Sequence, residues 1–174
     1  MRSTLSSTKK LTFSAILSGL AFVIMYLGTL TGVFDLCSVV VGSVCTMYAV
    51  IELRGIWPWL IAAVTSTLCI IFLPDKFCAL EYVALGGFYP IFKAIFERLP
   101  KALSLILKLC VLNAMLTVCL LLGKYLLGIT EDWASLNWIV YLICNAFFVF
   151  YDYALTVFAS YYMVKLRHRI KIRF

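Results

Sequence analysis

Residues 11–34 read LTFSAILSGLAFVIMYLGTLTGVF, a stretch of 24 residues without a charged side chain. An α-helix rises about 1.5 Å per residue, so this stretch is long enough to cross the ~30 Å hydrocarbon core of a bilayer. It lacks the polar zone of small residues at which a signal peptide is cleaved. We therefore expect it to remain in the protein as a membrane span.

The rest of the 174-residue chain has the same character. Hydrophobic residues make up 64% and charged residues 13% of the chain, which is too few charges for the surface of a soluble domain. Apolar runs between polar breaks predict six spans, at residues 11–32, 36–53, 56–73, 77–97, 101–123 and 136–165. The sequence therefore predicts an all-α fold, an integral membrane bundle of six transmembrane helices that forms one domain over residues 1–174.

The basic residues predict how this bundle is oriented. If the N-terminus lies inside, only Lys76 and Lys124 of the 15 lysines and arginines lie outside, and Lys108 falls within the fifth span. Such a bias indicates a protein of the plasma membrane with both termini in the cytoplasm. The net charge of +7 then reflects orientation, and we expect no nucleic-acid partner. The residues on the inner side are Arg2, Lys9, Lys10, Arg54, Lys93, Arg98, Lys101, Lys165, Arg167, Arg169, Lys171 and Arg173.

The chain lacks the motifs of common enzymes and metal sites. Its seven cysteines are isolated, without a CxxC pair or a Cys/His cluster, and are expected to be free thiols that pack as small apolar groups. There is no GxxxxGK[ST], GxSxG or HExxH motif. His168, in the basic tail, is the only histidine, so histidine-based catalysis inside the bundle is excluded. We expect no enzyme, no cofactor and no metal.

Three ionisable residues are expected at membrane depth: Glu81, Lys108 and Asp152. Each costs at least ~2.5–3.5 kcal/mol to insert, so each needs an explanation. Asn145 lies two helical turns from Asp152 on nearly the same face, and Asn113 of the fifth span is predicted to be level with Asp152 if the two helices are neighbours. Two interpretations stay open. Asp152 faces a ligand, or it pairs with Lys108 while Asn113 bonds between helices.

The fourth span is interrupted by Gly86-Gly87 and then Pro90, which weaken the backbone hydrogen-bond ladder at mid-membrane. Interrupted spans often mark transporter binding sites, and Glu81 and Tyr82 would then rim the opening. A simple kink, or close packing at the glycines, is the alternative.

Tryptophans and small residues mark two further places. Trp133 and Trp138 flank the last span on the outside, where they close over a ligand or belong to the interfacial aromatic belt. In the first span, Ala15 and Gly19 form a small-xxx-small pair that lets another helix approach closely. That helix belongs either to a partner protein or to the same bundle.

Over its whole length the chain resembles the substrate-binding S components of energy-coupling factor (ECF) transporters. The likeness consists of the size, the six spans, the positive cytoplasmic face, and the opening Lys10-Leu11-Thr12 followed by the Ala15/Gly19 pair. In that family a small-residue motif of the first helix, usually alanine at both positions, docks on a transmembrane coupling protein. Here Gly19 takes the second position.

The resemblance implies a subunit that captures a vitamin-like small molecule from outside and works with a coupling protein and ATPase subunits supplied in trans. The ligand-binding residues that it suggests are Glu81, Tyr82, Asn113, Trp133, Asn145 and Asp152.

The alternative is a structural membrane scaffold, resembling the cell-shape protein MreD, with no pocket and with Asp152 satisfied by Lys108. An outward cavity lined by Asn113 and Asp152 would favour capture, and a filled core would favour the scaffold. A third hypothesis, an intramembrane enzyme, needs a second polar group beside Asp152 on a path to bulk water.

Overall fold

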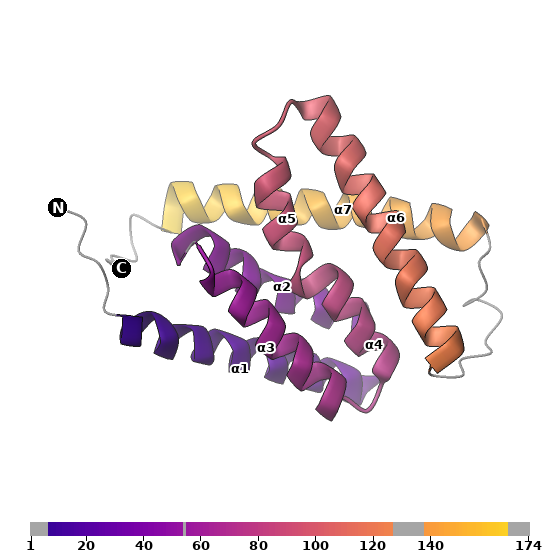
Figure 1. Ribbon diagram of the computed structural model, residues 1–174, viewed down its shortest axis with the longest axis horizontal. Coiled ribbons are helices and arrows are strands. Elements are labelled where there is room, and N and C mark those ends of the chain that lie inside the picture. The colour runs from indigo at the N-terminus through magenta and orange to yellow at the C-terminus, as the bar shows by residue number, and fades with distance from the viewer. Residues whose placement is uncertain (1–6, 54, 127–137, 167–174) are drawn as a thin grey trace.

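The computed structural model describes residues 7–53, 55–126 and 138–166, and over these residues the chain is helical without strands. The predicted all-α class is confirmed (Figure 1). The elements are α1 (Ser7–Thr31), α2 (Asp35–Glu52), α3 (Trp57–Phe72), α4 (Lys76–Glu81), the π-helical stretch η1 (Tyr82–Gly87), α5 (Tyr89–Phe96), α6 (Lys101–Leu126), α7 (Trp138–Tyr161) and the π-helical stretch η3 (Tyr162–Leu166).

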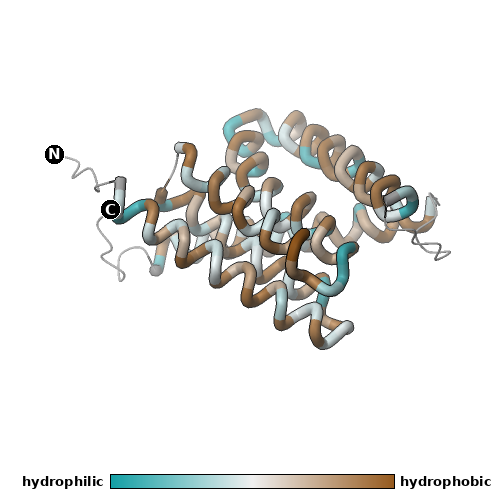
Figure 2. The backbone as a smooth tube through the Cα atoms, turned by 60° about the horizontal axis from the view of Figure 1, so that its bottom comes forward, coloured by the Kyte–Doolittle hydropathy of each residue, from teal (hydrophilic) through white to brown (hydrophobic). Residues whose placement is uncertain are grey.

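Five segments are long and apolar enough to cross a membrane, which indicates a membrane protein. They are α1, α2, the run from α4 through η1 to α5, α6, and α7 extended into η3. Hydropathy along the backbone agrees, because the helices are mostly hydrophobic and hydrophilic positions gather near their ends (Figure 2). The third predicted span is shorter than expected: α3 has 16 residues, a rise of about 24 Å.

The end of α3 is capped by the following loop. The Lys76 ammonium donates hydrogen bonds to three backbone carbonyl oxygens around the last turn of α3, and Asp75 accepts one from the Phe77 N–H (2.8 Å) as the N-cap of α4. A cation is favourable at the C-terminal end of a helix, where carbonyls lack helical partners. The predicted Pro74-Asp75-Lys76 break therefore ends one helix and begins the next. The three carbonyls belong to Ile70 (2.9 Å), Ile71 (3.3 Å) and Leu73 (2.9 Å).

The predicted interruption of the fourth span is a π-helix followed by a new α-helix. Pro90 lies at the start of α5 and has no N–H for the carbonyl of Leu85 five residues earlier. That carbonyl instead accepts a hydrogen bond from the Tyr151 hydroxyl of α7 (2.9 Å). Gly86 packs under the ring of Tyr82, since an added Cβ would lie 2.5 Å from Tyr82 Cδ2. The interruption of the fourth span therefore allows close packing and a contact with α7. This agrees with the alternative that the glycines serve close packing.

Three apolar clusters hold the described helices together. One packs α1 against α2 and α3 around Ala21, Ala49 and Ile61. A second lies among α1, α2, α3 and the start of the fourth span, around the fully buried Met25 and Tyr82. In it α1 and α2 approach so closely that a Cβ at Gly28 would collide with Ser38. The third cluster joins α7 to α2, α5 and α6 through Met47, Tyr89, Leu112, Phe148 and Tyr151. Figure 1 shows α6 crossing α7 at an angle, away from the α1–α3 group.

Candidate functional site

Asp152 of α7 lies at the centre of an ion network. The Tyr89 hydroxyl donates to its Oδ1 (2.5 Å), and the Lys108 ammonium donates to both carboxylate oxygens (3.1 and 3.0 Å). Lys93 of α5 donates to Oδ1 as well, and to the backbone carbonyl oxygen of Asp152 (3.1 Å). Both carboxylate oxygens of Asp152 are therefore occupied by protein donors.

Glu97 completes this network at the end of α5. Its Oε1 lies 3.0 Å from the Nζ of Lys93 and 3.6 Å from that of Lys108. Lys93 also donates to the hydroxyl oxygen of Thr156 (2.8 Å), and its side chain is fully buried. Two cations and two anions of the described chain thus meet with no net charge, which makes the ionised groups tolerable at membrane depth.

The structure therefore places Asp152 in the ion pair with Lys108 that was one of the two interpretations. Lys93 was missed, because it was assigned to the positive inner face of the membrane. The spacing of Lys93 and Glu97 by four residues was the available signal, since such residues face each other on a helix.

Two more polar pairs continue along the contact between the antiparallel helices α6 and α7. Asn113 and Asn145 exchange reciprocal side-chain hydrogen bonds (3.1 and 3.0 Å), and the hydroxyls of Thr117 and Tyr141 lie 2.9 Å apart. Asn113 is therefore level with Asn145 and not with Asp152 as predicted. The shared face of Asn145 and Asp152 is confirmed, because both contact α6.

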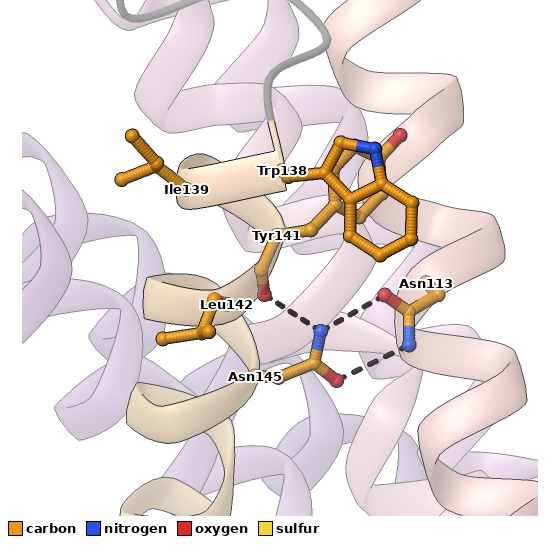
Figure 3. Close-up of a pocket in the computed structure, with 6 residues that line it drawn as sticks. All are labelled: Asn113, Trp138, Ile139, Tyr141, Leu142 and Asn145. Carbon is orange, nitrogen blue, oxygen red and sulfur yellow. Dashed lines mark hydrogen bonds between the residues drawn. The ribbon is translucent and has the colours of Figure 1, made fainter.

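A hollow of about 620 Å³ lies beside the amide pair, toward the end at which α6 finishes and α7 begins (Figure 3). Its wall is mostly apolar, with two amides and a phenol as polar groups, which is the usual composition of a small-molecule site. Trp138 is 92% exposed and forms the rim. The lining residues are Asn113, Trp138, Ile139, Tyr141, Leu142 and Asn145.

Of the predicted ligand-binding residues, the structure brings Asn113 and Asn145 together in this hollow. Asp152 lies outside the lining, in the ion network, and Tyr82 is fully buried in the α1–α3 core, so neither rims the hollow as expected. Glu81 is half-buried at the end of α4 and is not a lining residue either. Trp133 lies outside the described residues. Tyr141 was missed, although it lies four residues before Asn145 on the same helical face.

The proposed docking pair of α1 is open. Ala15 is exposed, and a Cβ added at Gly19 would meet no atom within 4 Å. Ser14 and Ser18, beside the pair, face the buried side of α1. Within the described chain no helix uses Gly19 for close approach, in contrast to Gly28.

Comparisons with known proteins found no relative. No protein-family model, no curated protein and no solved structure matches the chain. Its function is therefore inferred from its own geometry.

Proposed function

We propose that the chain is the solute-capture subunit of a membrane uptake system, similar to the S components of ECF transporters. The observation that supports this function is the hollow between α6 and α7, an apolar recess with three orienting polar side chains. A vitamin-like small molecule would enter it and rest against the Asn113–Asn145 pair.

The charge distribution supports an outward-facing hollow. The end of the bundle opposite the hollow carries the described basic residues Lys9, Lys10, Arg98, Lys101 and Lys165. By the positive-inside rule that end lies in the cytoplasm, together with both termini, and the hollow lies near the outer surface of the plasma membrane.

The exposed small residues of α1 support docking on a second protein. Without a side chain at Gly19, a helix of a transmembrane coupling protein can approach the backbone of α1 closely. ATPase subunits bound to that partner would supply the energy, since this chain has no nucleotide-binding motif.

The sequence suggested Asp152 as a ligand-binding residue. In this proposal it belongs to the ion network instead. It joins α7 to Lys93 of α5 and Lys108 of α6 by ion pairs that lie outside the lining of the hollow. It does not touch the ligand.

A structural scaffold, similar to MreD, remains the second candidate. The observation that favours it is the pairing of Asp152 with Lys108, which leaves this carboxylate satisfied by the protein alone. A scaffold needs neither an occupied hollow nor a docking partner.

Native mass spectrometry of the purified protein tests the two functions. Capture predicts a retained small molecule that is lost when Asn145 is changed to Leu. A scaffold predicts only lipid, in equal amounts in both proteins.

Co-purification tests the docking surface. Gly19→Leu places a large side chain in the open space on α1 and should abolish recovery of the coupling partner while the retained ligand stays. Gly19→Ala keeps the close approach and should retain the partner. Equal recovery with both variants would contradict docking through this surface.

A further inference from the structure

We infer that the hollow selects solutes that donate hydrogen bonds and rejects anionic ones. This inference rests on the proposed function and adds the chemical class of the solute. It follows from which donor hydrogens and acceptor lone pairs of the lining side chains already form hydrogen bonds within the protein.

The orientation of both side-chain amides is fixed by the backbone. The Nδ2 of Asn113 lies 2.8 Å from the carbonyl oxygen of Leu109, and that of Asn145 lies 2.7 Å from the carbonyl oxygen of Tyr141. A carbonyl oxygen only accepts hydrogen bonds, so the amide atom beside it must be the nitrogen.

All four amide hydrogens are consequently used. Each nitrogen donates one hydrogen to its backbone carbonyl and the other to the Oδ1 of the partner asparagine, as Figure 3 shows for Asn145. Each Oδ1 accepts one hydrogen bond from the described residues and can accept a second. The amide pair therefore offers acceptors and no donors.

The hydroxyl groups of Thr117 and Tyr141 also have no free hydrogen to donate to a ligand. Thr117 has one hydroxyl hydrogen, and it goes to the carbonyl oxygen of Asn113 (2.7 Å). At the contact between Thr117 and Tyr141, the Tyr141 hydroxyl must therefore be the donor. Its oxygen keeps lone pairs for a ligand, and its hydrogen is used.

Among the described lining side chains, the remaining donor is the indole N–H of Trp138 at the rim. Its ring nitrogen points away from the amide pair in Figure 3. The lining residues that the structure describes carry no charge, and the two lysines of the ion network are paired with Asp152 and Glu97.

A carboxylate or phosphate held against the amide pair would lose part of its water and, among the described residues, would face the lone pairs of three oxygens. Burying such a group without compensating hydrogen bonds is strongly unfavourable. An amide, amidinium or amine would instead donate to those oxygens, and its apolar part would contact Ile139 and Leu142. A cation would also be attracted by the aromatic faces of Tyr141 and Trp138.

Three probes of the same size and ring separate these cases: benzamide, benzamidinium and benzoate. Binding to the full chain in lipid nanodiscs is measured by saturation-transfer NMR. We expect saturable binding of benzamide and benzamidinium, and binding of benzoate at least about ten-fold weaker, because a site of acceptors leaves an anion unpaired. Equal binding of benzoate, or no saturable binding of benzamide, would overturn the inference.

A variant pair tests whether the acceptors carry the selectivity. Tyr141→Phe removes one acceptor oxygen and keeps the ring, so benzamide should bind about three- to ten-fold more weakly. Tyr153→Phe makes the same change at an exposed position of α7 outside the lining and should have no effect. Unchanged affinity in Tyr141→Phe would contradict the role of the acceptors.

The outcomes also separate this inference from the proposed function. A retained native ligand that carries a carboxylate or phosphate supports capture and overturns donor selection. Selective benzamide binding without any retained ligand supports donor selection and counts against capture.

Discussion

Replacing Asp152 by Asn should destabilise the protein strongly without changing the hollow. The substitution removes the anion that receives Lys93 and Lys108 and leaves Glu97 as their remaining carboxylate. Both lysines are buried, with side chains 0% and 9% exposed. Breaking a buried ion pair costs ~3–5 kcal/mol. The lower value applies here, because the Asp152 side chain keeps 21% exposure.

A loss of about 3 kcal/mol corresponds to a fall in Tm of about 6–12 °C for a chain of this length. The buried thiols Cys45, Cys69, Cys78 and Cys119 report unfolding, since a maleimide dye reaches them only when the bundle opens. Lys101→Gln, at an exposed cation of the same end, is the control and should leave the Tm unchanged.

Removing a second charge distinguishes charge imbalance from lost packing. In the double variant Asp152→Asn/Lys108→Met, Lys93 and Glu97 remain as a balanced pair 3.0 Å apart. The double variant should therefore lose about 2 kcal/mol less stability than the sum of the losses in Asp152→Asn and Lys108→Met. Additive losses, or a Tm shift below about 2 °C in the single variant, would refute the network as described. Benzamide binding should be unchanged in both, because Asp152 does not line the hollow.

Two further substitutions test the fourth span and its connection. Tyr151→Phe leaves the Leu85 carbonyl without its donor and should cost about 1–3 kcal/mol in the same thiol assay, whereas Tyr161→Phe at an exposed site should cost nothing. Lys76→Met removes the cap of α3 and should lower stability by about 0.3–1 kcal/mol. Full stability of Lys76→Met at low ionic strength would contradict the cap.

The spans could be predicted because a bilayer demands long apolar helices whatever their neighbours are. The predicted span 36–53 and α2 at Asp35–Glu52 differ by one residue at each end. The interruption at Gly86, Gly87 and Pro90 could also be predicted, because it depends on the backbone of one helix and not on its neighbours. The helix ends were less predictable: α1 includes Lys9 and Lys10, which the predicted span 11–32 left out, because hydrogen bonds and not hydropathy decide how far a helix extends.

The pairing between helices was predicted only in part. The Asp152–Lys108 pair was one of two interpretations, and Asn113 was placed level with Asp152 because depth was counted from the predicted helix ends. The last span was counted from residue 165, but α7 is α-helical to Tyr161 and continues as the π-helical η3. Counted from Tyr161, Asp152 is nine residues from the end of α7, close to the seven residues that separate Lys108 from the start of α6 at Lys101. The predicted end at residue 165 lies about one helical turn beyond Tyr161. Counted from Tyr161, Asp152 is level with Lys108, and Asn145 is level with Asn113.

The contact between α6 and α7 depends on these polar pairs more than a contact in a soluble protein would. Lipid is as apolar as leucine, so burying apolar side chains between two membrane helices gains little, whereas lipid cannot replace a hydrogen bond. Among the described residues of this contact, the charged groups lie toward the start of α6 and the end of α7, where they cancel, and the amide and hydroxyl pairs lie toward the start of α7. This separation keeps Asp152 in the ion network and leaves the described lining of the hollow uncharged, so the proposed solute would be recognised by shape and by its own donors.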